Sequence, residues 1–311
     1  MDKLLKVGVI GVGSMGQHHA RVYSEQSGVK LVGIADIDIE KASGIARKYN
    51  TNSFADYQKL LNQGLDGVSI TVPTSCHREI ALAVADAKVN MLVEKPLADT
   101  VDSAREITYK CEEKGVLLMV GHIERFNPII PVIKRSMEKT NVISIDITRV
   151  GPLPPRITDV GVMIDLAVHD IDLVRYLTGS EFKKTHALTS KSLSSKEDIA
   201  LLSLEMENGI LAHITTNWLT PFKVREISVF TREKLIKGWF IEQRVLEYST
   251  YEEDGSYVVR ELKIPYGEPL KLEIEAFIRS VRHNENPPIT GYDGIKSIEV
   301  VSLCTPTNEK V

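Results

Sequence analysis

The sequence predicts an α/β protein whose N-terminal part is a doubly wound parallel sheet. The chain has 311 residues, which indicates two domains at about 150 residues each. Its composition is that of an ordinary globular protein, with 43% apolar and 26% charged residues. In the N-terminal third, short β-branched runs alternate with helical patterns. The runs are almost wholly apolar, as expected for strands that helices cover on both faces.

The strands and helices of this part alternate strictly along the chain. The expected strands are 6–10, 30–36, 67–73, 90–95 and 116–121. The expected helices lie near 14–26, 39–48, 56–63, 77–88 and 100–114. Such alternation is typical of strands that pair in parallel and are connected by helices.

The first strand leads directly into the glycine-rich stretch GVGSMG, which opens the first helix. Gly11 permits a tight turn, Gly13 has no side chain to obstruct a pyrophosphate, and Gly16 lets helix and strand approach closely. The amides of the first helical turn, at Ser14 and Met15, would face the phosphates with the helix dipole behind them. A purely structural glycine turn is the alternative. In this context the motif predicts a dinucleotide site.

Asp36 ends the second expected strand, near the position where such sites carry an acidic residue. Its carboxylate can accept hydrogen bonds from the hydroxyls of an adenosine ribose, and it would repel the extra phosphate of NADP. Lys41 and Arg47 follow on a helix, where a solvated face explains them more simply. The predicted cofactor is therefore NAD.

Two further stretches lie at the carboxyl ends of expected strands, where ligands bind in open α/β sheets. They are TVPTSCH (71–77) and VEKP (93–96). The candidate cofactor contacts in them are Thr71, Pro73, Thr74, His77, Glu94 and Lys95. Pro96 disfavours a helical conformation at Lys95. We therefore expect a loop at the end of this strand. A solvated loop lysine is the alternative interpretation of Lys95.

The stretch GVMIDLAVHDID (161–172) concentrates ionisable residues among apolar ones. If it is helical, Asp165, His169 and Asp172 share one face. They could bind a metal, perform acid–base chemistry, or pair with neighbours. A metal site needs at least three ligands and an open position, and this helical set is an unusual one, so no metal is predicted. For Asp170 and Asp172 we expect pairing and surface roles, in a helix entered at Asp159.

Several classes of protein are excluded by composition. The net charge of −4, without a basic stripe, excludes a nucleic-acid partner. No apolar run reaches the roughly 18 residues of a membrane span, and the N-terminal apolar run ends in glycines rather than a signal-peptide cleavage site. The three scattered cysteines, Cys76, Cys111 and Cys304, form no CxxC pair. We therefore expect reduced thiols and a cytoplasmic location.

Five motifs in order resemble the Gfo/Idh/MocA oxidoreductases: GVGSMG, TVPTSCH, VEKP, GHIERFNP (121–128) and GVMIDLAVHDID. The resemblance covers at least residues 5–180. Within the family, the run 149–179 is most similar to the nucleotide-sugar 3-dehydrogenases, which act on UDP-N-acetylglucosamine or its uronic acid. Ala167 departs from the glycine that many members have in the pattern DxGxH.

The resemblance implies a domain division at 121/122. Residues 1–121 would form the NAD-binding Rossmann domain. Residues 122–311 would form a substrate-binding and oligomerisation α+β domain with a large, mostly antiparallel open sheet. The sequence agrees, because 143–150 alternates and 199–219 has the pattern of a hairpin around Asn208-Gly209. Further strands are expected at 223–230 and 256–265. In this family the open face of that sheet often forms the subunit contact, so we expect a homodimer or homotetramer.

The resemblance also assigns catalytic roles. Lys95 matches the family's active-site lysine, next to a cis proline, and Asp165 and His169 match its Asp-xxx-His pair. The implied reaction is oxidation of a sugar carbinol, in which a base removes the hydroxyl proton while hydride leaves for the nicotinamide. Histidine titrates near neutral pH, which suits a base. Lys95 could be a neutral base or a cationic donor to the alkoxide; we favour His169 as the base, with Asp165 holding its imidazole.

The expected partner is a small sugar or nucleotide sugar. Arg125 and Asn127, which follow the last strand of the first domain, are candidate substrate contacts together with Asp165 and His169. Arg156, in the proline-rich stretch GPLPPR, suits bidentate binding of phosphate. The alternatives are an inositol or other free-sugar dehydrogenase of the same family, a non-catalytic NAD-binding regulator, and a metal-dependent lyase or hydrolase.

Overall fold

The computed structural model describes residues 4–154 and 160–304. The chain divides into two compact units. The first combines residues 1–123 with 270–298, and the second combines 124–269 with 299–311. The sequence-based division at 121/122 leaves 270–298 in the second domain, whereas the structure packs that segment into the first unit.

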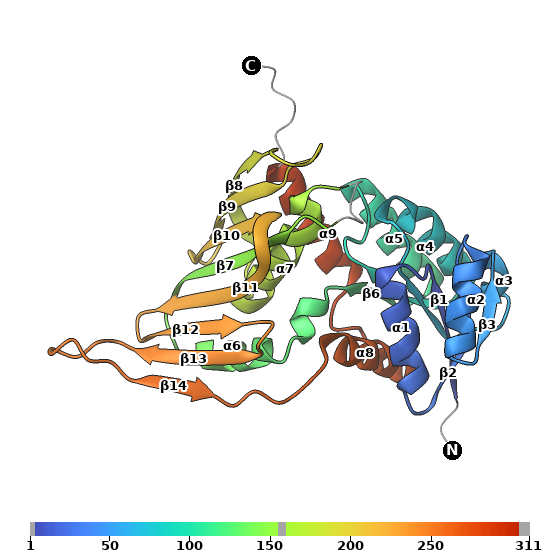
Figure 1. Ribbon diagram of the computed structural model, residues 1–311, viewed down its shortest axis with the longest axis horizontal. Coiled ribbons are helices and arrows are strands. Elements are labelled where there is room, and N and C mark those ends of the chain that lie inside the picture. Colours follow the sequence, from blue (N-terminus) through green and yellow to red (C-terminus); the bar gives the residue numbers. More distant parts are fainter. Residues whose placement is uncertain (1–3, 155–159, 305–311) are drawn as a thin grey trace. The chain divides into compact units, whose positions relative to one another are not determined.

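The first unit contains a six-stranded sheet in the order β3-β2-β1-β4-β5-β6 (Figure 1). Its strands are β1 (Leu5–Ile10), β2 (Val29–Ala35), β3 (Asn52–Phe54), β4 (Gly67–Ile70), β5 (Asn90–Glu94) and β6 (Leu118–Gly121). Every pair is parallel, which confirms the doubly wound sheet. Only β3 was not expected: it has three residues and pairs with β2 alone, so its sequence carries little strand pattern. The strand order reverses at β1, which is where open α/β sheets bind ligands.

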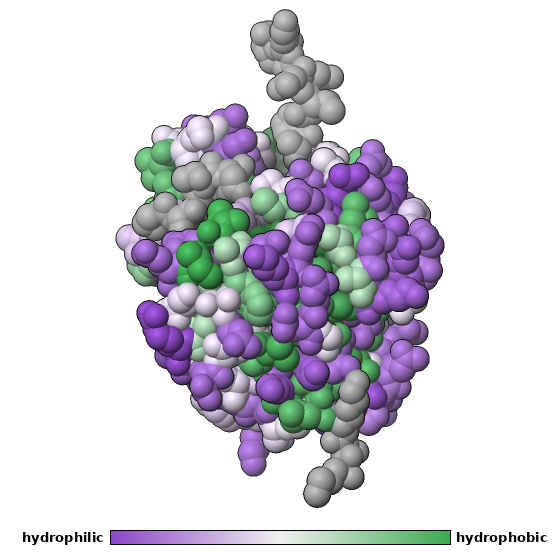
Figure 2. Space-filling model, turned by 90° about the vertical axis from the view of Figure 1, so that its right-hand side faces the viewer, coloured by the Kyte–Doolittle hydropathy of each residue, from purple (hydrophilic) through white to green (hydrophobic). Residues whose placement is uncertain are grey.

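Five α-helices connect the strands of this unit. They are α1 (Ser14–Glu25), α2 (Ile39–Lys48), α3 (Tyr57–Leu61), α4 (His77–Asp86) and α5 (Val101–Lys114). Local signals set their ends: the Asp38 side chain caps α2 by accepting from the Lys41 amide at 3.0 Å. Helix α5 ends at Gly115, whose φ of +65° is the left-handed conformation typical of a helix terminus. The side of the protein that Figure 2 shows is mainly hydrophilic, with apolar patches between the polar side chains.

Helix α8 (Pro269–His283) explains why the chain returns to the first unit. Its Phe277 is fully buried, and a Cβ atom on Gly67 of β4 would lie 3.1 Å from the Phe277 ring. At the other end of the helix, the Arg282 guanidinium donates to the carbonyl oxygen of Gly28 at 3.1 Å. These contacts join residues more than 200 positions apart, so no local sequence pattern indicates them.

The second unit contains an eight-stranded sheet in the order β14-β13-β12-β11-β7-β10-β9-β8. The strands are β7 (Val142–Pro152), β8 (Phe182–Ser190), β9 (Ile199–Met206), β10 (Leu211–Asn217), β11 (Leu219–Thr231), β12 (Lys234–Trp239), β13 (Arg244–Ser249) and β14 (Val259–Leu262). All pairs are antiparallel except β7 with β10. This confirms the mostly antiparallel sheet. The expected hairpin joins β9 to β10 through Gly209, whose φ is +84°.

One face of this sheet carries the core of the second unit. Along β9 the side chains alternate, and Leu202 and Leu204 are buried among apolar residues that include those of helices α6 (Ile129–Met137) and α7 (Val168–Thr178). The opposite face carries exposed apolar side chains that the strand register places on one side: Leu188, Leu201, Leu211 and Phe230. Helix α9 (Gly291–Cys304) ends the described chain. Among the described residues, none of the helices is both long and apolar enough to cross a membrane.

Candidate functional site

The loop between β1 and α1 has the geometry of a dinucleotide-binding turn. Gly11 has a φ of +85°, which L side chains rarely adopt, and a Cβ atom there would lie 2.7 Å from the Val72 side chain. At Gly16 a Cβ atom would lie 1.9 Å from the carbonyl oxygen of Gly11, so no side chain fits between helix and loop. A Cβ atom on Gly13 would have no neighbour within 4 Å. The loop is therefore closed on its inner side and open at Gly13.

Helix α1 begins at this loop without a side-chain cap. Gly13 occupies the N-cap position, and the first turn contains no acidic residue. Ser14 is exposed and Met15 is half-buried in that turn. The uncapped amides and the positive end of the helix dipole fit a pyrophosphate, as the glycine motif predicted.

Asp36 lies just beyond β2 and is hydrogen-bonded to the glycine loop. The Val12 amide donates to Asp36 Oδ2 at 2.7 Å, and the Asp38 amide donates to Oδ1 at 3.0 Å. Two backbone donors thus orient a half-buried carboxylate next to the turn that would hold the phosphates. This arrangement suits the ribose hydroxyls of NAD.

The stretch after β4 braces the same loop. Thr71 Oγ1 donates to the carbonyl oxygen of Gly11 at 2.5 Å, and the Thr71 amide donates to that of Ile10 at 2.9 Å. Pro73 is exposed, and Thr74 begins a 3-10 turn that ends at Cys76. Thr71 therefore positions the glycine loop, and cofactor contacts by Pro73 and Thr74 stay predictions.

His77 begins α4 and is almost fully buried, with 1% exposure. Its Nδ1 lies 2.9 Å from the Pro96 carbonyl oxygen, and its Nε2 lies 3.0 Å from that of Val72. Burial lowers the pKa of His77, although the two carbonyl groups oppose the shift. His77 therefore joins the turn after β4 to the turn after β5, and both of its ring nitrogens contact protein atoms.

Lys95 follows β5, at the same sheet edge as Gly11 and Thr71, because β4 lies between β1 and β5. The Lys95–Pro96 peptide bond is cis, as the resemblance implied. Lys95 is half-buried, and its amide donates to Glu94 Oε2 at 3.2 Å. The Glu94 carboxylate points into the unit, where it lies 3.0 Å from the His19 ring. Of the two predicted cofactor contacts in this stretch, Glu94 is thus engaged within the protein.

Asp165 and His169 lie in the second unit, on the segment that leads into α7. Residues Met163–Ala167 form a π-helical turn, in which the Val168 amide bonds to the carbonyl oxygen of Met163. Such wide turns occur often at functional sites. Both side chains are half-buried, whereas Ala167 between them is fully buried. Their catalytic roles stay predictions.

The surface roles expected for Asp170 and Asp172 are wrong. Their exposures are 0% and 1%, and each forms a two-pronged ion pair with a buried arginine. Arg149 Nε lies 2.9 Å from Asp170 Oδ1, and Arg125 Nη2 lies 2.6 Å from Asp172 Oδ1. The partners come from distant segments, so the helix sequence alone did not indicate them. Asp159, the expected start of this helix, lies outside the described residues.

Around Arg149 the ion pair extends into a buried network. Arg149 Nη1 also donates to Glu124 at 2.6 Å. Burial acts to lower the pKa of Arg149, but Asp170 and Glu124 raise it above its ordinary value. Burial and the charge of Arg149 lower the pKa of Arg225 to about 10, against the opposing charges of carboxylates that include Asp165. The helix that follows Asp165 and carries His169 is therefore held by buried ion pairs of Arg149.

The predicted substrate contacts have different surroundings. Arg125 pairs with Asp172, and its guanidinium carbon lies 4.9 Å from the centre of the Tyr176 ring. Asn127 is buried, donates to the Phe240 carbonyl oxygen at 3.1 Å and accepts from the Ile129 amide. Asn127 is thus part of the core of the second unit. Arg156 lies outside the described residues.

Sequence analysis missed Glu124, Arg149 and Arg225, although one signal was available for Arg149. In the alternating stretch 143–150, Arg149 has the same phase as the buried Ile145 and Ile147. A charge on the covered face of a strand requires a buried partner, and such groups often lie near functional sites.

Family models match a segment in each of the two units. The family model described as "Oxidoreductase family, NAD-binding Rossmann fold" matches residues 5–122. The model described as "GFO/IDH/MocA C-terminal domain" matches residues 145–237.

Two curated relatives and one solved structure illustrate the similarity. A UDP-N-acetylglucosamine 3-dehydrogenase of Acidithiobacillus ferrooxidans is 30% identical over 244 residues, which are 78% of this chain and 77% of the relative. A scyllo-inositol 2-dehydrogenase (NAD(+)) of Bacillus subtilis is 26% identical and covers 96% of this chain and 93% of its own. The solved structure of the Acidithiobacillus ferrooxidans enzyme has a TM-score of 0.90 at 26% identity and covers 96% of both chains.

Proposed function

This chain belongs to the Gfo/Idh/MocA family of oxidoreductases, and from this premise we propose that it is an NAD-dependent dehydrogenase that oxidises C3 of a UDP-N-acetylhexosamine. The family expected from the five motifs is confirmed, and so are the NAD-binding Rossmann domain and the oxidoreductase class. The sugar and the carbon are the new parts of the proposal. They are supported by the 30% identity to a UDP-N-acetylglucosamine 3-dehydrogenase.

The observation that carries a redox function is the position of Lys95. It lies at the carboxyl edge of the sheet that also carries the glycine loop and Asp36. The uncapped start of α1 would bind the pyrophosphate, and Asp36 would bind the ribose. NAD, when bound, supplies the acceptor for hydride. A lysine two strands away from the phosphate loop is then suited to a position near the reacting end of that cofactor.

In the proposed mechanism the protein moves one proton and stabilises one charge. His169 accepts the proton of the substrate hydroxyl at its imidazole, because histidine is the residue type whose ordinary pKa lies near neutral pH. Asp165 holds the imidazole in one orientation and stabilises its cation. The Lys95 ammonium donates a hydrogen bond to the oxygen on which negative charge develops. The reverse assignment, with Lys95 as the base, remains the alternative.

A second candidate is a dehydrogenase of inositol or another free sugar. The similarity to the Bacillus subtilis scyllo-inositol 2-dehydrogenase favours it, because that match spans 96% of this chain. Arg156 distinguishes the candidates, since we propose that it binds a phosphate that free sugars lack. A non-catalytic NAD-binding regulator is the alternative from another class.

A substrate panel tests the proposal. We expect NADH formation, followed by absorbance, with UDP-N-acetylglucosamine or its uronic acid in the presence of NAD. Turnover of myo- or scyllo-inositol without turnover of either nucleotide sugar would favour the second candidate. Binding of NAD without turnover of any of these compounds would point to the regulator.

The proposal includes a homo-oligomer that forms through the open face of the second sheet. Leu188 and Leu211 on that face are 62% and 53% exposed, and several exposed apolar side chains on one sheet face are typical of a contact surface. We expect Leu201→Glu together with Leu211→Glu to convert a dimer or tetramer to monomers, because a buried carboxylate would lack a partner. Light scattering on a sizing column gives the mass. The control Leu272→Glu makes the same kind of substitution at an exposed position of α8 in the first unit, and a wild-type monomer would contradict the assembly.

We also propose a cytoplasmic location. It fits a nicotinamide cofactor and three cysteines of which two, Cys111 and Cys304, are buried thiols.

A further inference from the structure

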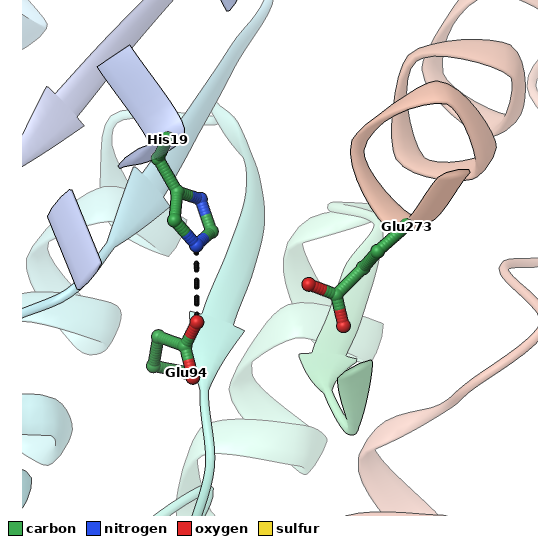
Figure 3. A group of neighbouring side chains, drawn as sticks. All are labelled: His19, Glu94 and Glu273. Atoms are coloured by element: carbon green, nitrogen blue, oxygen red, sulfur yellow. Dashed lines mark hydrogen bonds and ion pairs between the residues drawn. The ribbon is translucent and has the colours of Figure 1, made fainter. Parts of the chain in front are cut away.

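A cluster of three ionisable side chains is buried inside the first unit, and one of them, Glu94, immediately precedes Lys95 in the chain. His19 comes from α1, Glu94 from the end of β5, and Glu273 from α8 (Figure 3). Their exposures are 0%, 8% and 0%. One nitrogen of His19 and one oxygen of each carboxyl group all lie within 4.8 Å of one another. Three ionisable groups buried this close together are unusual, because burial of an isolated charge is strongly unfavourable.

One half of the cluster is fully hydrogen-bonded. Glu94 accepts from the Lys95 amide at 3.2 Å and from His19 Nε2 at 3.0 Å. The other ring nitrogen of His19 lies 3.0 Å from Ser69 Oγ, which lies 2.8 Å from the Tyr23 hydroxyl. With Glu94 ionised, one arrangement of protons satisfies this chain: Tyr23 donates to Ser69, Ser69 donates to Nδ1 of His19, and Nε2 donates to Glu94.

Glu273 is the exception. Both of its carboxyl oxygens are buried, and neither has a hydrogen-bond partner among the residues that the structure describes. Figure 3 shows this carboxyl group directed toward Glu94 and His19. Burial, and next the charge of Glu94, raise the pKa of Glu273 well above its ordinary value. Both the missing partners and the raised pKa favour the protonated form of Glu273, which has one O–H group to donate.

The natural acceptor for that O–H group is Glu94. Burial acts to raise the pKa of Glu94, but the His19 hydrogen bond and the charge of Lys95 bring it below its ordinary value. The surroundings thus favour the ionised form of Glu94 and the protonated form of Glu273, as in other carboxyl pairs whose surroundings differ. Their oxygens are close enough for a bridging water or a rotation of the Glu273 side chain to complete a hydrogen bond.

We propose that Glu273 holds a proton that it shares with Glu94, directly or through one water, and that the pair positions the Lys95 turn. The pair has a single negative charge, which lies on Glu94. The Glu94 carboxylate accepts the hydrogen bond from the Lys95 amide. A protonated Glu273 occupies a further lone pair of this carboxylate, so the carboxylate stays oriented toward the turn. The positioning role for Lys95 rests on the proposed function, whereas the shared proton does not.

Infrared spectroscopy of the full chain tests the protonation state directly. At neutral pH we expect the carbonyl band of a protonated carboxylic acid in the wild type and its loss in Glu273→Gln. Glu275→Gln is the matched control, because Glu275 lies two positions away on α8 and is half-buried. That variant keeps the band. A wild type without the band, or a Glu273→Gln variant that retains it, would overturn the proposal.

The pH dependence of unfolding gives a second measurement. Because the pKa of Glu273 is raised in the folded state, its stabilising effect is complete below the unfolded value of about 4.3 and is lost as pH rises toward the folded value. Between these two pKa values, the equilibrium constant for unfolding should rise with pH more steeply in the wild type than in Glu273→Gln. The difference is up to about a factor of ten per pH unit. Equal slopes would contradict a stored proton.

Metal analysis tests whether the cluster holds a metal ion in place of the shared proton. A histidine and two carboxylates could also hold a divalent ion. We expect no stoichiometric metal in the protein purified with added zinc or manganese. One ion per chain that Glu273→Gln loses would overturn the proposal, because the ion would then fill the cluster in place of the proton.

The positioning role has its own readout. Glu273→Leu removes the donor, and we expect it to lower kcat about tenfold, the effect of one lost hydrogen bond, with the KM for NAD little changed. Glu273→Gln restores an N–H donor and should recover most of that loss. Equal losses in the two variants would exclude positioning. If no substrate is turned over at all, the proposed function fails, while the infrared and unfolding results still decide the shared proton.

Discussion

Replacement of His169 by glutamine is expected to lower kcat about 10²–10⁴-fold, the usual contribution of a general base. This corresponds to about 3–5 kcal/mol of lost transition-state stabilisation. Glutamine retains polarity and similar size but cannot accept the substrate proton. Steady-state kinetics with the substrate found in the panel measures the effect. His283→Gln is the control, since His283 is an exposed residue at the end of α8.

The pH profile of the same variants separates the two assignments of the base. If His169 is the base, the acidic limb of kcat/KM in the wild type disappears in His169→Gln and persists at lower amplitude in Lys95→Met. If Lys95 is the base, the limb persists in His169→Gln and disappears in Lys95→Met. Lys59→Met, at an exposed position on α3, controls for the loss of a surface charge. Wild-type kcat in both His169→Gln and Lys95→Met would contradict the proposed mechanism.

Replacement of Asp170 by asparagine should lower the free energy of unfolding by about 3–5 kcal/mol. The side chain is 0% exposed and pairs with Arg149 through both carboxylate oxygens. Removing its charge leaves the Arg149 guanidinium buried with Glu124 as its one remaining carboxylate in the pair network. Denaturant unfolding measures the change, and Asp146→Asn, at an exposed position of β7, gives the matched control.

The double variant Asp170→Leu with Arg149→Met shows whether the cost comes from the uncompensated charge. Removing both partners together should recover a large part of the loss, because apolar residues of similar size often replace a buried ion pair at little cost. A loss below about 1 kcal/mol in Asp170→Asn would mean that the pair behaves like a surface ion pair, contrary to its burial.

The first unit was largely predictable because its signals are local. An apolar strand, a glycine turn, an amphipathic helix and the acidic residue after the next strand all lie within about 30 consecutive residues of a βαβ unit. Gly11, Gly16 and Asp36 need only that local context to acquire their geometry. Lys95 was found in the same way, because parallel strands bring their carboxyl ends to one edge of the sheet.

The second unit was predictable in its hairpins and not in its long-range pairing. The β9–β10 turn follows from Asn208 and Gly209, whereas the parallel pairing of β10 with β7 joins residues that are far apart in the chain. Only the large antiparallel sheet as a class was expected, through resemblance.

The sequence by itself predicted the dinucleotide fold and its glycine loop, its resemblance identified the family, and it named Lys95, Asp165 and His169 as candidate catalytic residues. The tertiary structure alone decided which charged residues are buried and what they contact. We expected surface positions for Asp170 and Asp172, yet both are buried, and their partners lie 21 and 47 positions away. On α8, Glu273 lies three positions after Leu270 and four before Phe277, both buried, and only the fold places it beside a carboxylate of β5. The energy of a buried charge depends on its partners in space, and sequence periodicity reports only the side of the element on which a residue lies.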